Sequence, residues 1–213
     1  MTNRSPSKAQ VQTFQTSWTV FWVAFLFRLF QLARTPVRGG MVDQFLDHRS
    51  FGWEAGRIAH ALVTGHGYAD PFFGHTGPTA WAAPLYPLLL AAVFKLFGDY
   101  SVLSGWIGLA LNCFLFALMT RTIYEIAARC FRRSTALWAA WIWALYPAAM
   151  LFFVWETIVS TYLLTCILVL SLRMRGVGET SVPAASDAGM DRDPRTLRRW
   201  LAFGFLWVLL GLT

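Results

Sequence analysis

The fold of this chain is decided by residues 101–128, which read SVLSGWIGLALNCFLFALMTRTIYEIAA. The run carries no charged side chain before Arg121, and it exceeds the roughly 20 residues that a helix needs to cross the core of a bilayer. A basic cluster of Arg129, Arg132 and Arg133 follows it. The pattern predicts a membrane-spanning helix that ends at the cytoplasmic surface.

The composition of the whole chain indicates the same class. Of the 213 residues, 56% are hydrophobic and 14% are charged, whereas a soluble domain carries about 25% charged residues. The net charge of +7 comes from basic residues between apolar runs, so it indicates topology and not nucleic-acid binding. Cys113, Cys130 and Cys166 lack metal or CxxC spacing. The composition therefore excludes a soluble globular domain.

Four further apolar runs predict an all-α, polytopic chain with about five spans. They are residues 17–33, 136–154, 155–172 and a run that begins at Trp200. The arginine clusters place the N-terminal tail and a loop at residues 176–198 in the cytoplasm, and residues 34–100 outside. We expect a multi-pass protein of the inner (plasma) membrane with a cytoplasmic N-terminus. Because the last span stops at Thr213, we also expect the N-terminal part of a longer protein.

Residues 34–100 are too polar to sit in lipid and predict an outer loop. Within it, Phe51, Ala55, Ile58 and Leu62 recur at helical spacing, which is typical of an amphipathic helix at the interface. A turn-rich segment follows. Residues 84–97 are apolar but too short to cross the bilayer, so they predict a second interfacial helix.

Carboxylates in this loop are the first candidates for chemistry. On an interfacial helix beside Trp53, Glu54 would be partly desolvated and could act as a general base. The alternative is a solvated side chain paired with Arg57. Asp70 precedes Pro71, so it is either a second catalytic carboxylate or a turn former.

Three further sets of polar residues have an open interpretation. Asp47, with Asp43 and His48, forms either a cation site or an exposed loop, and three histidines show no ligand spacing: His60, His66 and His75. Glu156 at the start of a span is either functional or an interfacial anchor. Arg28 within the first span is expected to reach the interface or a lipid phosphate.

The order of motifs resembles the polyprenol-phosphate-sugar-dependent membrane glycosyltransferases of family 39, which includes protein mannosyltransferases and the lipid A aminoarabinose transferase. The resemblance covers roughly residues 18–133. It rests on an acidic residue opening an interfacial helix, a Pro-Leu-Tyr motif opening a second one, and a Leu-Phe-Gly end. These motifs are Trp53-Glu54-Ala55-Gly56-Arg57-Ile58-Ala59, the stretch from Leu62 to Tyr68, Pro84-Leu85-Tyr86-Pro87-Leu88-Leu89-Leu90 and Lys95-Leu96-Phe97-Gly98.

The resemblance implies that residues 1–213 are the N-terminal part of one glycosyltransferase domain. The reaction would pass a sugar from a polyprenyl-phosphate donor to an acceptor glycan, lipid or protein at the outer face. Glu54 and Asp70 would be catalytic, and five residues would bind substrate: Asp47, Arg57, Trp81, Tyr86 and Glu156. Where the family has an acidic pair, this chain has Trp53-Glu54, and where the family has an acidic residue before the Pro-Leu-Tyr motif, it has Trp81-Ala82-Ala83. The resemblance is compatible with a divalent metal, but no ligand set for one is visible. The alternatives are a non-catalytic fragment or assembly subunit, and a lipid or solute transporter.

Overall fold

The structure is a computed structural model, and it describes residues 8–34, 51–146, 156–178 and 194–213. These residues form seven helices and, outside them, one isolated bridge between Ala69 and Pro78. The all-α prediction is confirmed for this part of the chain. The helices are α1 (Lys8–Arg34), α3 (Trp53–Val63), α4 (Leu85–Phe97), α5 (Val102–Cys130), α6 (Arg133–Leu145), α7 (Thr157–Met174) and α8 (Pro194–Gly211).

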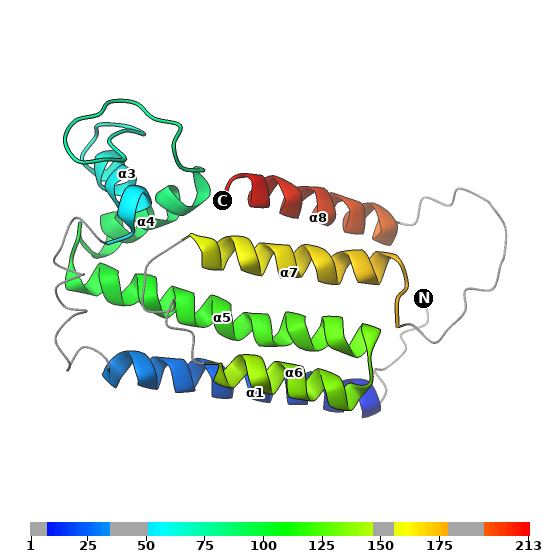
Figure 1. The fold of residues 1–213 in the computed structure, drawn as a ribbon. Helices are drawn as coiled ribbons and strands as arrows, with labels where there is room; N and C mark the ends of the chain where they lie inside the picture. Colours follow the sequence, from blue (N-terminus) through cyan, green and yellow to red (C-terminus); the bar gives the residue numbers. More distant parts are fainter. Residues whose placement is uncertain (1–7, 35–50, 147–155, 179–193) are drawn as a thin grey trace.

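Five of these helices lie side by side, and the other two form a cap at one end (Figure 1). The central helix is α5, which packs against α1, α6 and α7, while α8 packs against α7. Along the chain, α5, α6, α7 and α8 alternate in direction. The cap consists of α3, α4 and the segment between them, and α8 ends beside it.

The sequence of α5 explains its central place. Ser101 caps the helix by accepting a hydrogen bond from the Ser104 backbone N–H at 3.0 Å. The buried face of α5 includes Gly105, Gly108 and Ala117, and small residues of this kind let neighbouring helices approach closely. A helix that meets three neighbours needs such a face.

Two of the described helices, α5 and α7, are long and apolar enough to cross a membrane. The expectation of about five spans is therefore met only in part. The apolar part of α1 is Ser17–Ala33, which falls short of the required length. Helix α6 has 13 residues, or about 20 Å of rise, and α8 opens with Arg195, Arg198 and Arg199.

Several boundaries differ from the prediction. Helix α1 begins at Lys8, inside the expected tail, and α8 begins at Pro194, inside the expected loop at 176–198. The end of the predicted span 136–154 lies outside the described residues. Helix α8 runs through its own arginines because arginine favours helix, so these polar residues did not mark the start of α8.

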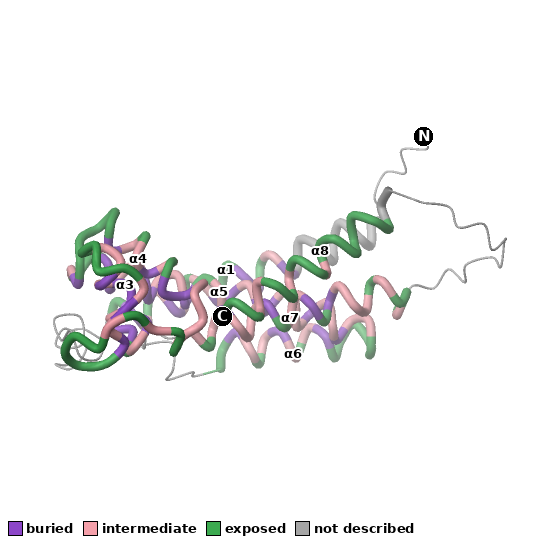
Figure 2. Tube along the Cα trace, turned by 90° about the horizontal axis from the view of Figure 1, so that it is seen from above, coloured by how far each residue is buried: buried purple, intermediate pink, exposed green. Residues whose placement is uncertain are grey.

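Figure 2 shows that α8 is exposed along most of its described length.

The amphipathic helix and the second cap helix are both present. Helix α3 buries Ala55, Ile58 and Ala59, and α4 buries Leu90 and Phe94 against it. An aromatic cluster joins the cap to the start of α5. Within that cluster, ring centroids lie 5.4 Å apart for Phe51 and Phe94, and 5.0 Å apart for Phe94 and Tyr100.

The expectation for Arg28 is wrong. This side chain is only 1% exposed, and its guanidinium lies 3.7 Å from the centroid of the Phe116 ring. Its Nη2 donates to the backbone carbonyl oxygens of Trp143 at 3.0 Å and Ala144 at 3.2 Å. Carbonyl groups at a helix C-terminus attract a cation, so Arg28 ties α1 to the end of α6 instead of reaching the interface.

Candidate functional site

A cavity of about 220 Å³ lies where the cap meets the ends of α7 and α8. Four residues that the sequence singled out line it together, although they come from different elements: Glu54, Trp81, Tyr86 and Glu156. The remaining lining residues are Ala55, Ala82, Ala83, Pro87 and Thr213. The sequence did not identify these neighbours, because small and apolar residues carry no signal of a site.

Glu54 is placed by an unusual start of α3. Gly52 precedes the helix with a φ of 65°, a left-handed conformation that glycine adopts at little cost, and Trp53 follows with a φ of 49°. The Gly56 backbone N–H then donates to the Gly52 carbonyl oxygen at 2.9 Å. This sharp entry puts Glu54 in the first turn, half-buried at the cavity wall.

Tyr86 is placed by the first turn of α4. It is 2% exposed, yet it lines the cavity. Burial raises the pKa of the Tyr86 hydroxyl above its ordinary value, and the negative charge of Glu156 raises it further. The hydroxyl therefore stays protonated at neutral pH and is available as a hydrogen-bond donor.

Glu156 and Thr213 line the cavity from the ends of two bundle helices, α7 and α8. Glu156 immediately precedes α7, and Thr213 follows α8. The Leu85 backbone N–H donates to the Leu212 carbonyl oxygen at 2.7 Å, which joins the start of α4 to the end of α8. Residues separated widely in sequence thus converge at one end of the bundle.

Trp81 forms the outer wall and is 66% exposed. Its ring centroid lies 5.1 Å from that of Phe72 in a T-shaped arrangement. The wall is anchored beside Trp81, because the Tyr68 hydroxyl donates to the Ala82 carbonyl oxygen at 2.8 Å. An exposed indole held in this way is a contact surface for a ligand.

Arg57 and Asp70 do not line this cavity but a second one in the cap. The Arg57 Nη1 donates to the Pro71 carbonyl oxygen at 2.8 Å. Asp70 has a φ of 57°, and its Oδ1 accepts the Gly77 N–H at 2.8 Å. This bond is the main cause that lowers the Asp70 pKa. The geometry is that of a turn former, one of the two interpretations left open by the sequence.

Asp47, with Asp43 and His48, lies outside the described residues. Among the residues that the structure does describe, no group of three His, Cys, Asp or Glu side chains is placed to hold a metal ion. The carboxylates of the first cavity, Glu54 and Glu156, can accept protons and hydrogen bonds.

In the part of the chain that the structure describes, these features define a helical bundle with two helices long and apolar enough to cross a membrane and a cavity beside the cap. No protein-family model matches the chain, and neither a curated protein nor a solved structure does so.

Proposed function

We propose that this chain belongs to a membrane glycosyltransferase, which transfers a sugar from a polyprenyl-phosphate donor to an acceptor at the outer face of the membrane. One observation carries the proposal: Glu54, Trp81, Tyr86 and Glu156 line the same cavity. These residue types suit the reaction, because a carboxylate can take a proton while hydroxyl and carboxylate groups orient a sugar.

The arrangement of the bundle supports a matching topology. We propose that α1, α5, α6, α7 and α8 all cross the membrane, with the N-terminus in the cytoplasm and the cap outside. The cap lies at one end, and Arg129, Arg133 and Arg173 lie at the ends of helices on the opposite side. Basic residues collect on the cytoplasmic side of membrane proteins.

In the proposed reaction, Glu54 removes the proton of the acceptor hydroxyl as its oxygen attacks the anomeric carbon. A new C–O bond forms, the bond from the anomeric carbon to the phosphate oxygen breaks, and the polyprenyl phosphate leaves with the bonding electron pair. Tyr86 donates a hydrogen bond to the sugar and Glu156 accepts one. Arg57 lines the second cavity and donates to the Pro71 carbonyl oxygen, so it is not assigned to the leaving phosphate.

A transporter is less well supported. A substrate path through a bundle uses charged groups or broken helices near its middle. In the described part of the bundle, the buried charged side chain is Arg28, and it is held by carbonyl groups at the end of α6. The candidate carboxylates lie at the end of the bundle instead, which favours an enzyme acting at the interface.

The test is transfer of radiolabelled sugar from a polyprenyl-phosphate donor in membranes. Glu54→Gln keeps the shape and removes the charge, and it is expected to lower the rate by about 10²–10⁴-fold. Lys95→Gln is the control, because Lys95 is an exposed charged residue of α4 that lines neither cavity of the cap. Near-normal transfer by a well-expressed Glu54→Gln protein contradicts the assignment of Glu54. A wild-type chain that transfers nothing favours the alternative of a non-catalytic fragment or assembly subunit.

A further inference from the structure

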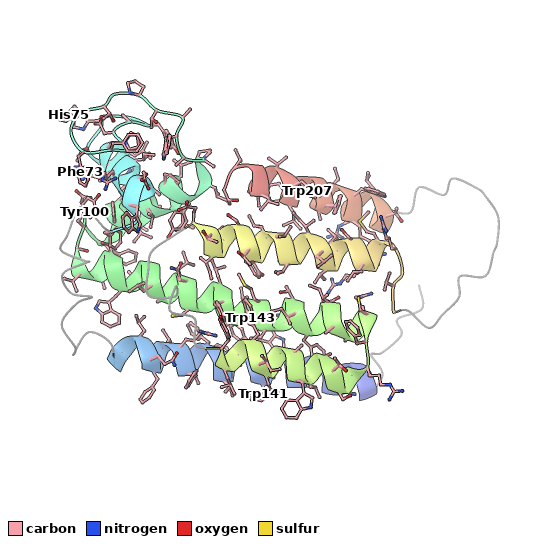
Figure 3. The ribbon with its side chains drawn as sticks, in the orientation of Figure 1. Phe73, His75, Tyr100, Trp141, Trp143 and Trp207 are labelled. Atoms are coloured by element: carbon pink, nitrogen blue, oxygen red, sulfur yellow. The ribbon has the colours of Figure 1, made fainter. Side chains whose placement is uncertain are left out.

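The second cavity of the cap, of about 400 Å³, has its own chemistry. It lies along α3 beyond Glu54, and the loop that carries Phe72, Phe73 and His75 forms part of its lining. Figure 3 shows Phe73, His75 and Tyr100 together at this end of the molecule. The volume falls within the range of about 300–1,000 Å³ that is usual for small-molecule sites.

Aromatic rings form one part of its lining and are fixed before any ligand arrives. Phe73 is 65% exposed, yet the Arg57 guanidinium carbon lies 4.3 Å from its ring centroid. Phe72 is held by its T-shaped contact with Trp81. Exposed rings that are held in place offer flat apolar surfaces at little entropic cost.

Polar groups form the rest of the lining. His60 Nδ1 lies 2.6 Å from Asp99 Oδ2, so the carboxylate orients the imidazole ring by accepting a hydrogen bond from Nδ1. The Thr64 hydroxyl lies 2.9 Å from His66 Nδ1. The Asp70 carboxylate, whose Oδ1 accepts the Gly77 N–H, provides a further acceptor. Hydrogen-bond donors and acceptors thus stand beside ring faces.

This mixture discriminates between ligand classes. A loop that inserts into lipid would not place Asp70 and three imidazoles beside its phenylalanines, because polar groups are costly in hydrocarbon. An anion would meet the Asp70 carboxylate, while the Arg57 guanidinium in the same lining is already engaged by the Pro71 carbonyl oxygen and the Phe73 ring. A neutral polyhydroxylated ligand can contact both the aromatic rings and the polar groups of the lining. Its C–H faces cover the rings, and its hydroxyl groups both donate and accept hydrogen bonds.

We infer that this cavity binds a neutral saccharide unit. The cavity adjoins the Glu54 cavity, because Glu54 and Arg57 are neighbours on α3 and the Phe72–Trp81 pair stands between the two spaces. In the transferase proposed above the unit belongs to the acceptor, and this last assignment rests on the proposed function. The acceptor is then a glycan, whose hydroxyl reaches Glu54 past Trp81.

The experiment measures sugar binding apart from transfer. The full chain is placed in nanodiscs of zwitterionic lipid, and ligand-observed NMR is recorded with methyl α-mannoside, methyl β-glucoside and methyl β-N-acetylglucosaminide. Phe73→Ala and His60→Ala are each expected to weaken binding of the bound sugar by about 3- to 10-fold. Leu96→Ala is the matched control, since Leu96 is a 75% exposed apolar residue of the cap that lines neither cavity.

The outcomes separate this site from the proposed function. Unchanged sugar binding by Glu54→Gln, together with weakened binding by Phe73→Ala, supports a saccharide site distinct from the Glu54 cavity. Sugar binding by a wild-type chain that transfers nothing supports the saccharide site and favours the non-catalytic fragment or assembly subunit over the transferase. Three results overturn the inference: no sugar of the set binds, binding is the same in Phe73→Ala, His60→Ala and wild type, or inorganic phosphate displaces the sugar.

Discussion

Gly56→Ala is the sharpest available test of how the cap is built. A Cβ atom added at Gly56 would lie 2.0 Å from the Phe51 carbonyl oxygen, whereas contacts of Cβ atoms below 3.0 Å essentially do not occur. The backbone must therefore move by at least 3.0 − 2.0 = 1.0 Å. Since the obstacle is main chain, we expect the upper end of the overpacking cost, about 3 kcal/mol. Alanine returns about 1 kcal/mol through its helix propensity, which leaves a loss of about 2 kcal/mol.

The matched control is Gly204→Ala in α8, where an added Cβ meets no atom within 4 Å. That variant gains helix propensity without a clash, so its stability should rise by about 1 kcal/mol. Thermal unfolding followed by circular dichroism should show a midpoint about 4–8 °C lower for Gly56→Ala and about 2–4 °C higher for Gly204→Ala. Shifts of the same sign and size in both variants would refute the close approach of α3 to Phe51.

Two further predictions follow from single side chains. Arg28→Met removes the guanidinium that binds the α6 carbonyl groups, so the free energy of unfolding should fall by about 2 kcal/mol. In the control, Arg133→Met at an exposed position, thermal unfolding should show a change within about 0.5 kcal/mol. Equal losses in the two variants would contradict the buried role of Arg28. The lowered pKa of Asp70 means that its bond to Gly77 is fully present above the ordinary value of 3.8 and is lost as the pH falls through the lowered value. The amide NMR signal of Gly77 should titrate with a midpoint below 3.8 in the wild type and should not follow this titration in Asp70→Asn, and a midpoint at or above 3.8 would contradict the bond.

The helices of the cap were predictable because their local patterns agree with their final environment. The spacing of Ala55 and Ile58 gave α3 its buried face, and the 84–97 run matches α4. The start of α8 was not predictable from polarity, because arginines favour helix as well as loops. The role of Arg28 was missed for a different reason: its partners are backbone carbonyl groups of α6, and such groups leave no trace in the residue types.

The candidate site was predictable as a set of residues but not as a geometry. Partial desolvation beside Trp53 indicated Glu54, charge at the start of a span indicated Glu156, and the family resemblance indicated Tyr86. The structure brings all three to one cavity. The resemblance assigned Arg57 to the same substrate site as Glu54. In the structure Arg57 lies outside that site, because its guanidinium donates to the Pro71 carbonyl oxygen in the loop from Tyr68 to Pro78.

The division of α3 between two cavities explains why its entry is so tightly fixed. A helix of 11 residues presents Glu54 to one space and Arg57 with His60 to another, so a small rotation would exchange the residues that face each space. Two features of the backbone oppose this rotation of α3. Gly52 has a left-handed conformation, and Gly56 packs closely against the Phe51 carbonyl oxygen. Any change that frees the start of α3 should therefore disturb both cavities at once. A variant that loses sugar binding and transfer together, with the bundle intact, would mark this entry as the common cause.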